Sequence, residues 1–141
     1  MERLPLDAGD EELIEAARAT IRQLYRENRH HIAAALRTTN GRIHTAVHLD
    51  TYVGRASVCA EAIAVGKAIA SGDPDIAAIV SVRHPRPREM SRDIQVVSPC
   101  GICRELLNDF APNCTVIIPA DGELARVPVA QLLPSKYVRN L

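Results

Sequence analysis

The sequence predicts an α/β domain, and three observations lead to that prediction. Apolar residues recur at spacings of three and four within residues 10–29, as in an amphipathic helix. An Asn40-Gly41 pair separates two apolar runs, which is typical of a β-hairpin. Residues 42–82 then show strand, helix and strand patterns in succession, which favours the crossover unit of an α/β sheet.

The first helix is expected over residues 10–29, and a hairpin is expected to follow it. The apolar stripe of the helix consists of Leu13, Ile14, Ala17, Ile21, Leu24 and Tyr25. Asp10 can cap the N-terminus, because its carboxylate can accept hydrogen bonds from free backbone N–H groups. Residues 32–37 and 42–49 flank the Asn-Gly turn and are expected to form antiparallel strands, while His30-His31 is expected at the surface.

The rest of the chain predicts two more helices and several strands. Helices are expected over residues 58–71 and 100–110, because turn-forming residues follow each apolar pattern. Short apolar runs indicate strands at residues 76–82, 94–97, 114–118 and 124–127, a loop at 84–89 and a helical turn at 129–133. No repeat or linker interrupts residues 1–141, so we expect one domain.

Composition narrows the possible partners and the cellular location. The 17 basic residues balance the 17 acidic ones, and aromatic residues make up only 3%, which disfavours nucleic acid as a partner. No apolar run approaches the ~20 residues of a membrane span, and the N-terminus lacks an apolar signal core. Four cysteines with a Cys-x-x-Cys spacing then favour metal binding over disulfides. We expect a cytoplasmic protein that acts on a small molecule and binds no membrane.

Cys59, Cys100 and Cys103 form the candidate metal site. Pro99 fits the first turn of a helix, so Cys100 and Cys103 are expected near a helix N-terminus, where the dipole and free N–H groups favour a thiolate. Cys59 is expected to open the preceding helix in the same way. Three sulfurs leave one tetrahedral position for water, as in catalytic zinc sites. Cys114 heads an apolar strand and is expected to be a core thiol.

Glu61 completes a recognisable pattern. It follows Cys59 by two residues and would project beside the water without binding the ion. Cys59-Ala60-Glu61 together with Pro99-Cys100-Gly101-Ile102-Cys103 resembles the signature of the short, all-cysteine cytidine deaminases, which include the blasticidin S deaminases. The resemblance runs from about Arg42 to the C-terminus. It implies a mixed five-stranded sheet in an α/β/α sandwich, one zinc ion per subunit, a homotetramer, and hydrolytic deamination with Glu61 as proton shuttle.

The resemblance also implies which residues bind the substrate. The backbone N–H of Ala60 would face a ring carbonyl, and the carbonyl of Ser98 would accept from the exocyclic amine. Relatives that act on nucleosides carry Asn-x-Glu where this chain has His48-Leu49-Asp50, so His48 and Asp50 replace the groups that bind ribose. Tyr137 lies in a C-terminal tail similar to that of the blasticidin S deaminases and is a candidate lid over a neighbouring subunit's pocket.

Three thiolates around one divalent ion leave a net negative charge, so positive groups are expected nearby. An Arg commonly follows the catalytic Glu in the cytidine deaminases, and Ala62 stands there instead. Arg104, directly after Cys103, matches an Arg usual in the family and is a candidate donor to a thiolate. Arg55 is a candidate replacement for the missing cation, with an ordinary surface Arg as the alternative.

The expected function is zinc-dependent hydrolysis of the amino group of a cytosine nucleoside or close analogue, with release of ammonia. One alternative keeps this chemistry but takes blasticidin S or another aminated heterocycle without ribose specificity. A second alternative, from another class, is a zinc-stabilised binding protein without catalysis. Glu61 beside an open coordination position argues against that alternative, because structural zinc sites close with four protein ligands.

Overall fold

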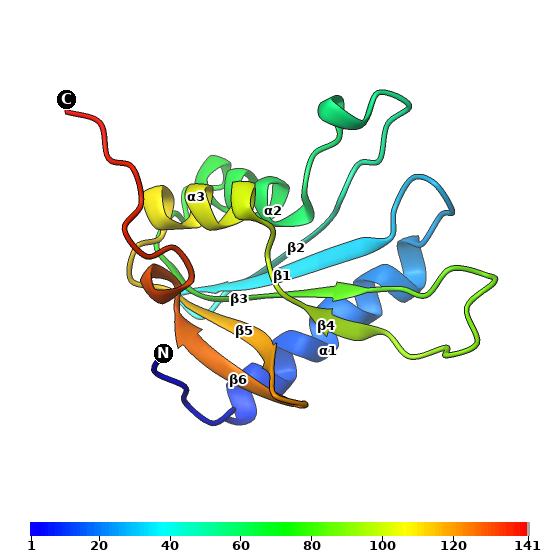
Figure 1. The fold of residues 1–141 in the computed structure, drawn as a ribbon, viewed down its shortest axis with the longest axis horizontal. Coiled ribbons are helices and arrows are strands. Elements are labelled where there is room, and N and C mark those ends of the chain that lie inside the picture. The colour runs from blue at the N-terminus through cyan, green and yellow to red at the C-terminus, as the bar shows by residue number, and fades with distance from the viewer. Residues whose placement is uncertain (141) are drawn as a thin grey trace.

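The computed structural model describes residues 1–140, which form a six-stranded mixed sheet between two layers of helices (Figure 1). The strand order is β2-β1-β3-β5-β6, and β4 pairs with β3 outside this path. The elements are α1 (Ala8–Leu24), β1 (Ile32–Thr38), β2 (Ile43–Val47), η1 (Gly54–Ala56), α2 (Ala60–Ala70), β3 (Ile76–Arg83), β4 (Gln95–Val97), α3 (Gly101–Phe110), β5 (Thr115–Ala120), β6 (Glu123–Pro128) and η2 (Val129–Leu132).

The topology combines a hairpin with two crossovers. β1 is antiparallel to both β2 and β3, so β2 and β3 run in the same direction, with α2 between them in sequence. β3 and β5 form a parallel pair, and α3 makes the second crossover. β4 matches the strand expected at residues 94–97, and it makes the sheet six-stranded where the family resemblance implied five strands. It pairs with Ser81–Arg83, past the Ala78–Ile79 segment that pairs with β5.

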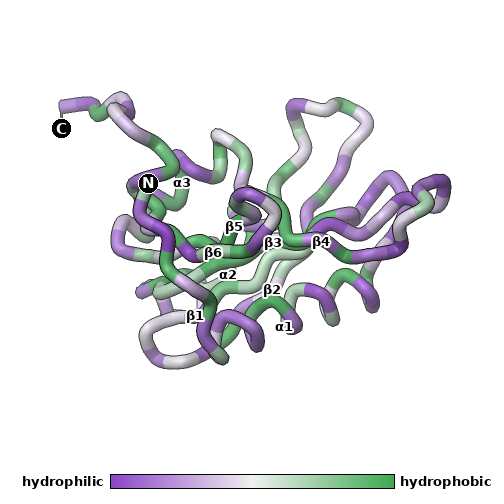
Figure 2. The backbone as a smooth tube through the Cα atoms, turned by 60° about the horizontal axis from the view of Figure 1, so that its bottom comes forward, coloured by the Kyte–Doolittle hydropathy of each residue, from purple (hydrophilic) through white to green (hydrophobic). Residues whose placement is uncertain are grey.

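The two faces of the sheet bury separate cores. α1 covers one face, and α2 and α3 cover the other (Figure 1). Along β1, Ala33 and Ala35 face α1, whereas Ala34 and Leu36 face the opposite layer, as the period of two requires. Figure 2 shows apolar residues along the central strands and hydrophilic residues in the loops beyond their ends. α2 and α3 share one core on the same face of the sheet, so their N-termini belong to the same layer.

The boundaries of α1 differ from the expected ones. Asp7 is the N-cap, because its side chain accepts from the Asp10 N–H at 2.9 Å while the Asp10 side chain accepts from the Asp7 N–H at 3.0 Å. The prediction that Asp10 is the N-cap was therefore wrong. Asp10 is instead the N3 residue of a capping box. The helix ends at Leu24 rather than near residue 29, since Tyr25 leaves the helical region with ψ 132°.

A buried carboxylate joins the β1–β2 hairpin to the turn before β3. Asp73 is inaccessible to solvent and accepts hydrogen bonds from Thr38 Oγ1 at 2.7 Å, Asn40 Nδ2 at 2.9 Å and His44 Nε2 at 3.0 Å. These hydrogen bonds, above all that from His44, lower the pKa of Asp73. The hairpin turn that presents Asn40 uses Gly41 at φ +82°, a conformation that favours glycine.

None of the helices within residues 1–140 combines the length and apolarity needed to cross a membrane.

Candidate functional site

The structure brings the three predicted cysteines together. Cys59 is the N-cap of α2 and Cys100 is the N-cap of α3, while Cys103 lies in the first turn of α3. Their Sγ atoms all lie within 4.8 Å of one another, and those of Cys59 and Cys100 are 3.5 Å apart. Within residues 1–140 no other group of His, Cys, Asp or Glu gathers closely enough to share an ion. The N-termini of two helices therefore build one thiol cluster.

The donor set fits zinc. The distance between Cys59 and Cys100 is shorter than the ~4.6 Å that two Zn–S bonds can span. Burial alone would raise the pKa of Cys100, but the backbone N–H of Cys103, the neighbouring thiols of Cys59 and Cys103 and the backbone N–H of Ile102 together outweigh it and lower that pKa. Burial raises the pKa of Cys59 and of Cys103. Three cysteine sulfurs that converge in this way are a donor set that a soft divalent ion such as zinc prefers, and the ion binds them as thiolates.

Cys114 stands apart from this cluster. It is buried in the core just before β5, and burial raises the pKa of its thiol to about 12. A thiol that stays protonated at neutral pH and has no neighbouring ligand packs as a small apolar side chain. Its surroundings agree with the predicted core role.

Glu61 lies in the first turn of α2 and is almost fully buried, with 5% of its surface exposed. Burial raises the pKa of this carboxyl group, while its own backbone N–H and the Ser81 hydroxyl oppose the rise. Ser81 was not predicted as a site residue. It lies on β3 two positions beyond Ile79, so it faces α2 as Ile79 does. The only feature of the sequence that could have marked Ser81 as a site residue is its hydroxyl group inside an apolar strand.

A cavity of about 110 Å³ lies against the thiols. Its lining residues come from β1, the end of β2, the start of α2 and the β4–α3 junction: Ile32, His48, Cys59, Ala60, Glu61, Val97, Ser98 and Cys100. Of the predicted substrate-binding residues, His48, Ala60 and Ser98 line it. A flat ring held between the apolar walls would meet polar groups only at its edge.

The other two predicted substrate-binding residues lie outside this lining. Asp50 follows β2, and its Oδ1 accepts from Ser57 Oγ at 3.4 Å. Tyr137 is 72% exposed and lies beside Phe110, at the end of α3 opposite to Cys100. The tail that carries Tyr137 is held by Lys136, whose Nζ lies 2.8 Å from Asp109 and 3.1 Å from Glu105.

The two candidate arginines differ in their surroundings. Arg104 donates from Nε to the Pro99 carbonyl at 2.9 Å and from one guanidinium nitrogen to the Leu132 carbonyl at 3.2 Å. It therefore fastens the loop before Cys100 to η2. Arg55 lies exposed in η1 and forms no ion pair within residues 1–140.

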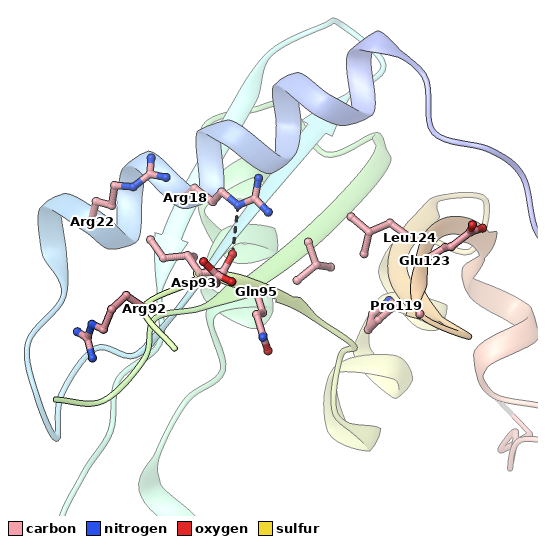
Figure 3. Close-up of a pocket in the computed structure, with 11 residues that line it drawn as sticks. Arg18, Arg22, Arg92, Asp93, Gln95, Pro119, Glu123 and Leu124 are labelled. Atoms are coloured by element: carbon pink, nitrogen blue, oxygen red, sulfur yellow. Dashed lines mark hydrogen bonds between the residues drawn. The ribbon is translucent and has the colours of Figure 1, made fainter. Parts of the chain in front are cut away.

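A larger cavity of about 620 Å³ lies on the α1 side of the sheet (Figure 3). Figure 3 shows Arg18, Arg22 and Arg92 around it, with Asp93 among them. Arg18 donates from Nε to the Ile94 carbonyl at 3.2 Å, and the side chain of Glu15 lies within 3.7 Å of both helix arginines. These arginines already have partners, and no thiol lines the cavity. The deaminase-like groups belong to the smaller cavity.

Comparisons with known proteins agree with this geometry. The sequence profile described as "Cytidine and deoxycytidylate deaminase zinc-binding region" matches residues 8–118. A blasticidin-S deaminase from Bacillus cereus is 49% identical over 140 residues, which cover 99% of this chain and 100% of the relative. The solved cytidine deaminase from Burkholderia pseudomallei superimposes with a TM-score of 0.72 at 26% identity, covering 90% of this chain and 98% of the other. The cytidine deaminase from Bacillus anthracis gives a TM-score of 0.75 at 25% identity, with 90% and 88% covered.

Proposed function

The chain belongs to the cytidine and deoxycytidylate deaminase family and is a zinc-binding hydrolytic deaminase, and we propose that its substrate is blasticidin S rather than cytidine. The observation that carries the choice is His48. It lines the cavity at the position where nucleoside-specific relatives carry the Asn of their ribose-binding motif. The similarity to the Bacillus cereus blasticidin-S deaminase along almost the whole chain supports the same choice.

In the proposed mechanism Cys59, Cys100 and Cys103 hold the zinc ion. When bound, the ion supplies a Lewis acid that brings the pKa of a water molecule to about 7. Glu61 takes a proton from the attacking water, and the new C–O bond forms at the ring carbon that carries the amino group. Glu61 delivers this proton to the ring nitrogen, then takes the second proton from the newly added hydroxyl group and passes it to the amino group, so the C–N bond breaks, a carbonyl forms and ammonia leaves. The burial of Glu61 suits a carboxyl group that must carry a proton in one step and release it in another.

The rest of the cavity orients the ring. The backbone N–H of Ala60, at the first residue of α2, is proposed to donate to the ring carbonyl. The Ser98 carbonyl is proposed to accept from the exocyclic amine. Ile32 and Val97 supply apolar walls for the ring faces. These contacts recognise an aminopyrimidine edge and do not depend on the group attached to the ring.

We further propose that the enzyme is a cytoplasmic homotetramer, with the whole chain acting as one domain. Four large apolar residues lie exposed on α3 and the tail: Ile102 at 75%, Phe110 at 58%, Tyr137 at 72% and Val138 at 77%. Such a surface suits burial against further copies. The cavity of about 110 Å³ is also smaller than the ~300–1,000 Å³ usual for ligand sites, so a neighbouring copy that carries Tyr137 would complete it. Light scattering on the zinc-loaded enzyme tests this proposal, and a monomer would refute it.

An ammonia-release screen tests the substrate. The panel contains blasticidin S, cytidine, deoxycytidine, cytosine and guanine, each assayed with zinc-saturated enzyme. We expect kcat/KM for blasticidin S to exceed that for cytidine by roughly 100-fold or more, because misplaced polar contacts discriminate strongly. A higher kcat/KM for cytidine would assign the enzyme to nucleoside turnover, and no ammonia from any compound would favour a zinc-stabilised binding protein.

A further inference from the structure

Four of the five histidines gather with Tyr25 at the end of the sheet beside the active-site cavity. Tyr25 stacks on His84 with ring centroids 3.9 Å apart and meets His31 edge-on at 5.5 Å. The His31 and His48 rings follow at 5.7 Å. His30 joins the group through its Nδ1, which lies 2.8 Å from the His48 carbonyl. Within this cluster, His48 is the residue that lines the cavity.

The hydrogen bonds of His48 fix the position of its ring proton. The backbone N–H of His31 donates to His48 Nε2 at 2.7 Å. A backbone N–H can only donate, so this nitrogen must offer its lone pair, and a neutral ring then carries its proton on Nδ1. If the His48 ring were charged, Nε2 would also carry a proton, and this N–H would point at the backbone N–H of His31. Burial, followed by the neighbouring His31, lowers the pKa of His48, which favours the same neutral state.

The free nitrogen of His48 is available to a ligand. Nδ1 forms no hydrogen bond within residues 1–140, and unlike Nδ1 of His31 it is not sealed from solvent. The ring therefore presents one N–H donor and no acceptor on the side that the protein leaves open. A substrate group with a lone pair can use this donor, whereas a hydroxyl that needs an acceptor finds none in this ring.

The turn before β1 holds this arrangement. The Asn28 N–H donates to His31 Nε2 at 2.8 Å, so the side chain of His31 closes the turn whose backbone reaches His48. Asn28 has φ 61°, a left-handed conformation that Asn tolerates better than most residues. Backbone hydrogen bonds between Arg26 and His30 brace the same turn. His31 is 5% exposed and its Nδ1 has no partner within residues 1–140, so the hydrogen bond from Asn28 to Nε2 is what holds the ring in the turn.

We propose that His48 donates from Nδ1 to an acceptor on the substituent carried by the pyrimidine ring, and that His31 is the positioning residue that fixes this donor. The inference rests on the proposed deaminase substrate class and narrows it. The favoured substituent offers an ether, carbonyl or carboxylate oxygen at this point. A substituent recognised only through hydroxyl donation is disfavoured.

A comparison of substituted and unsubstituted rings tests the role of His48. Wild type and His48→Leu are assayed with blasticidin S, with cytidine and with 1-methylcytosine, which has no acceptor on its substituent. We expect His48→Leu to lower kcat/KM for the preferred substituted substrate by about tenfold or more, the value of one well-placed hydrogen bond, and that for 1-methylcytosine by less than about threefold. An equal loss on both would overturn the inference. If only cytidine is turned over, the proposed substrate fails, and the comparison is made on cytidine.

A spectroscopic measurement on the wild-type enzyme tests the tautomer directly. In protein labelled with ¹⁵N-histidine, NMR is expected to find His48 protonated at Nδ1 and unprotonated at Nε2. His31→Leu should release His48 to both tautomers and reduce its preference for the substituted ring. His84→Phe is the matched control, because it keeps the stack on Tyr25, and the Nδ1 of His84 lies 2.7 Å from the Pro85 carbonyl rather than bonding His48. A wild-type His48 protonated at Nε2 would refute the proposal.

Discussion

The Sγ atoms of Cys59 and Cys100 lie 3.5 Å apart although 41 positions separate the two residues. Each residue is the N-cap of its helix, so both sulfurs lie at helix N-termini. Both sulfurs are therefore free to face a common ion. The thiol cluster joins the two helices at their N-termini, so zinc is expected to stabilise the fold as well as the reaction.

The first prediction separates ligand from core thiols. Cys103→Ser should lose most of the bound zinc, because a serine hydroxyl does not replace a thiolate ligand. Cys114→Ser is the matched control and should keep about one zinc ion per chain, although it loses some stability by placing a hydroxyl in the core. Metal content is measured by mass spectrometry after gel filtration. Loss of zinc from Cys114→Ser would contradict the site as described.

The second prediction concerns Glu61. Glu61→Gln should keep the zinc ion, because the carboxylate is not needed as a ligand, and should lower kcat by about 10²–10⁴-fold, the usual worth of general acid–base catalysis. Glu11→Gln, on the exposed face of α1, is the control and should turn over like wild type. Ammonia release and zinc content are measured on the same preparations. Turnover by Glu61→Gln at the wild-type rate would exclude the proton-shuttle role.

Arg104 and Arg55 give a third prediction. Arg104→Ala removes the bonds to the Pro99 and Leu132 carbonyls and should weaken zinc binding by ~10–100-fold, because residues that hold ligands in place matter almost as much as ligands. Arg55→Ala should leave the zinc affinity unchanged, since the structure gives Arg55 no ion pair within residues 1–140. Competition with a chromophoric chelator measures both. If Arg55→Ala is the weaker binder, Arg55 supplies the missing positive charge after all.

The metal site could be predicted from the sequence because its chemistry lies in short motifs. Cys-x-x-Cys after Pro99 and Cys-x-Glu at a helix start place donors by local geometry alone, and α2 and α3 begin within two residues of the expected positions. Hydrophobic periodicity likewise located each strand of the sheet. β4 carried the weakest signal, because a strand of three residues shows little hydrophobic periodicity.

The histidine cluster could not be predicted, because tertiary contacts create it. His31 stands beside His30 before a strand and was expected at the surface, which was wrong, since it is 5% exposed. Its burial depends on α1 ending at Leu24, so that the turn through Asn28 folds back on Tyr25. Nothing in the local sequence marks that end clearly. Ser81 was missed for a related reason, because only the packing of α2 on β3 brings it to Glu61.

The buried histidines give a prediction for pH. Burial lowers the pKa of both His31 and His48 from the ordinary value of 6.5, and Arg86 adds to the effect on each. Asp50 opposes it at both residues and Glu27 at His31. Below pH 6.5 the unfolded chain therefore binds protons that the folded chain does not. The free energy of unfolding should fall as pH is lowered from 6.5 through the folded pKa values.

Urea unfolding at several pH values between 5 and 7.5 measures this dependence, with zinc held in excess because its binding also depends on pH. The matched comparison is the double variant His31→Asn and His48→Asn, which cannot take up these protons. Its stability should depend less on pH than that of wild type. Equal slopes for the two proteins would mean that other groups cause the acid sensitivity.

The final prediction concerns the buried carboxylate of Asp73, which lies before β3 and away from the thiol cluster. Thr38→Val removes one of its three side-chain donors while keeping the shape of the side chain. An acceptor left without its donor in a buried site is costly, so the variant should melt several degrees lower, given that ~1 kcal/mol moves Tm by about 2–4 °C in domains somewhat larger than this one. Thr39→Val is the control, because Thr39 is exposed and its side chain bonds to nothing within residues 1–140. Calorimetry should separate the two variants while kcat stays unchanged in both. If the two variants have the same Tm, the hydrogen bond from Thr38 to Asp73 does not stabilise the contact between the hairpin and the turn before β3, and Asn40 and His44 alone hold Asp73 there.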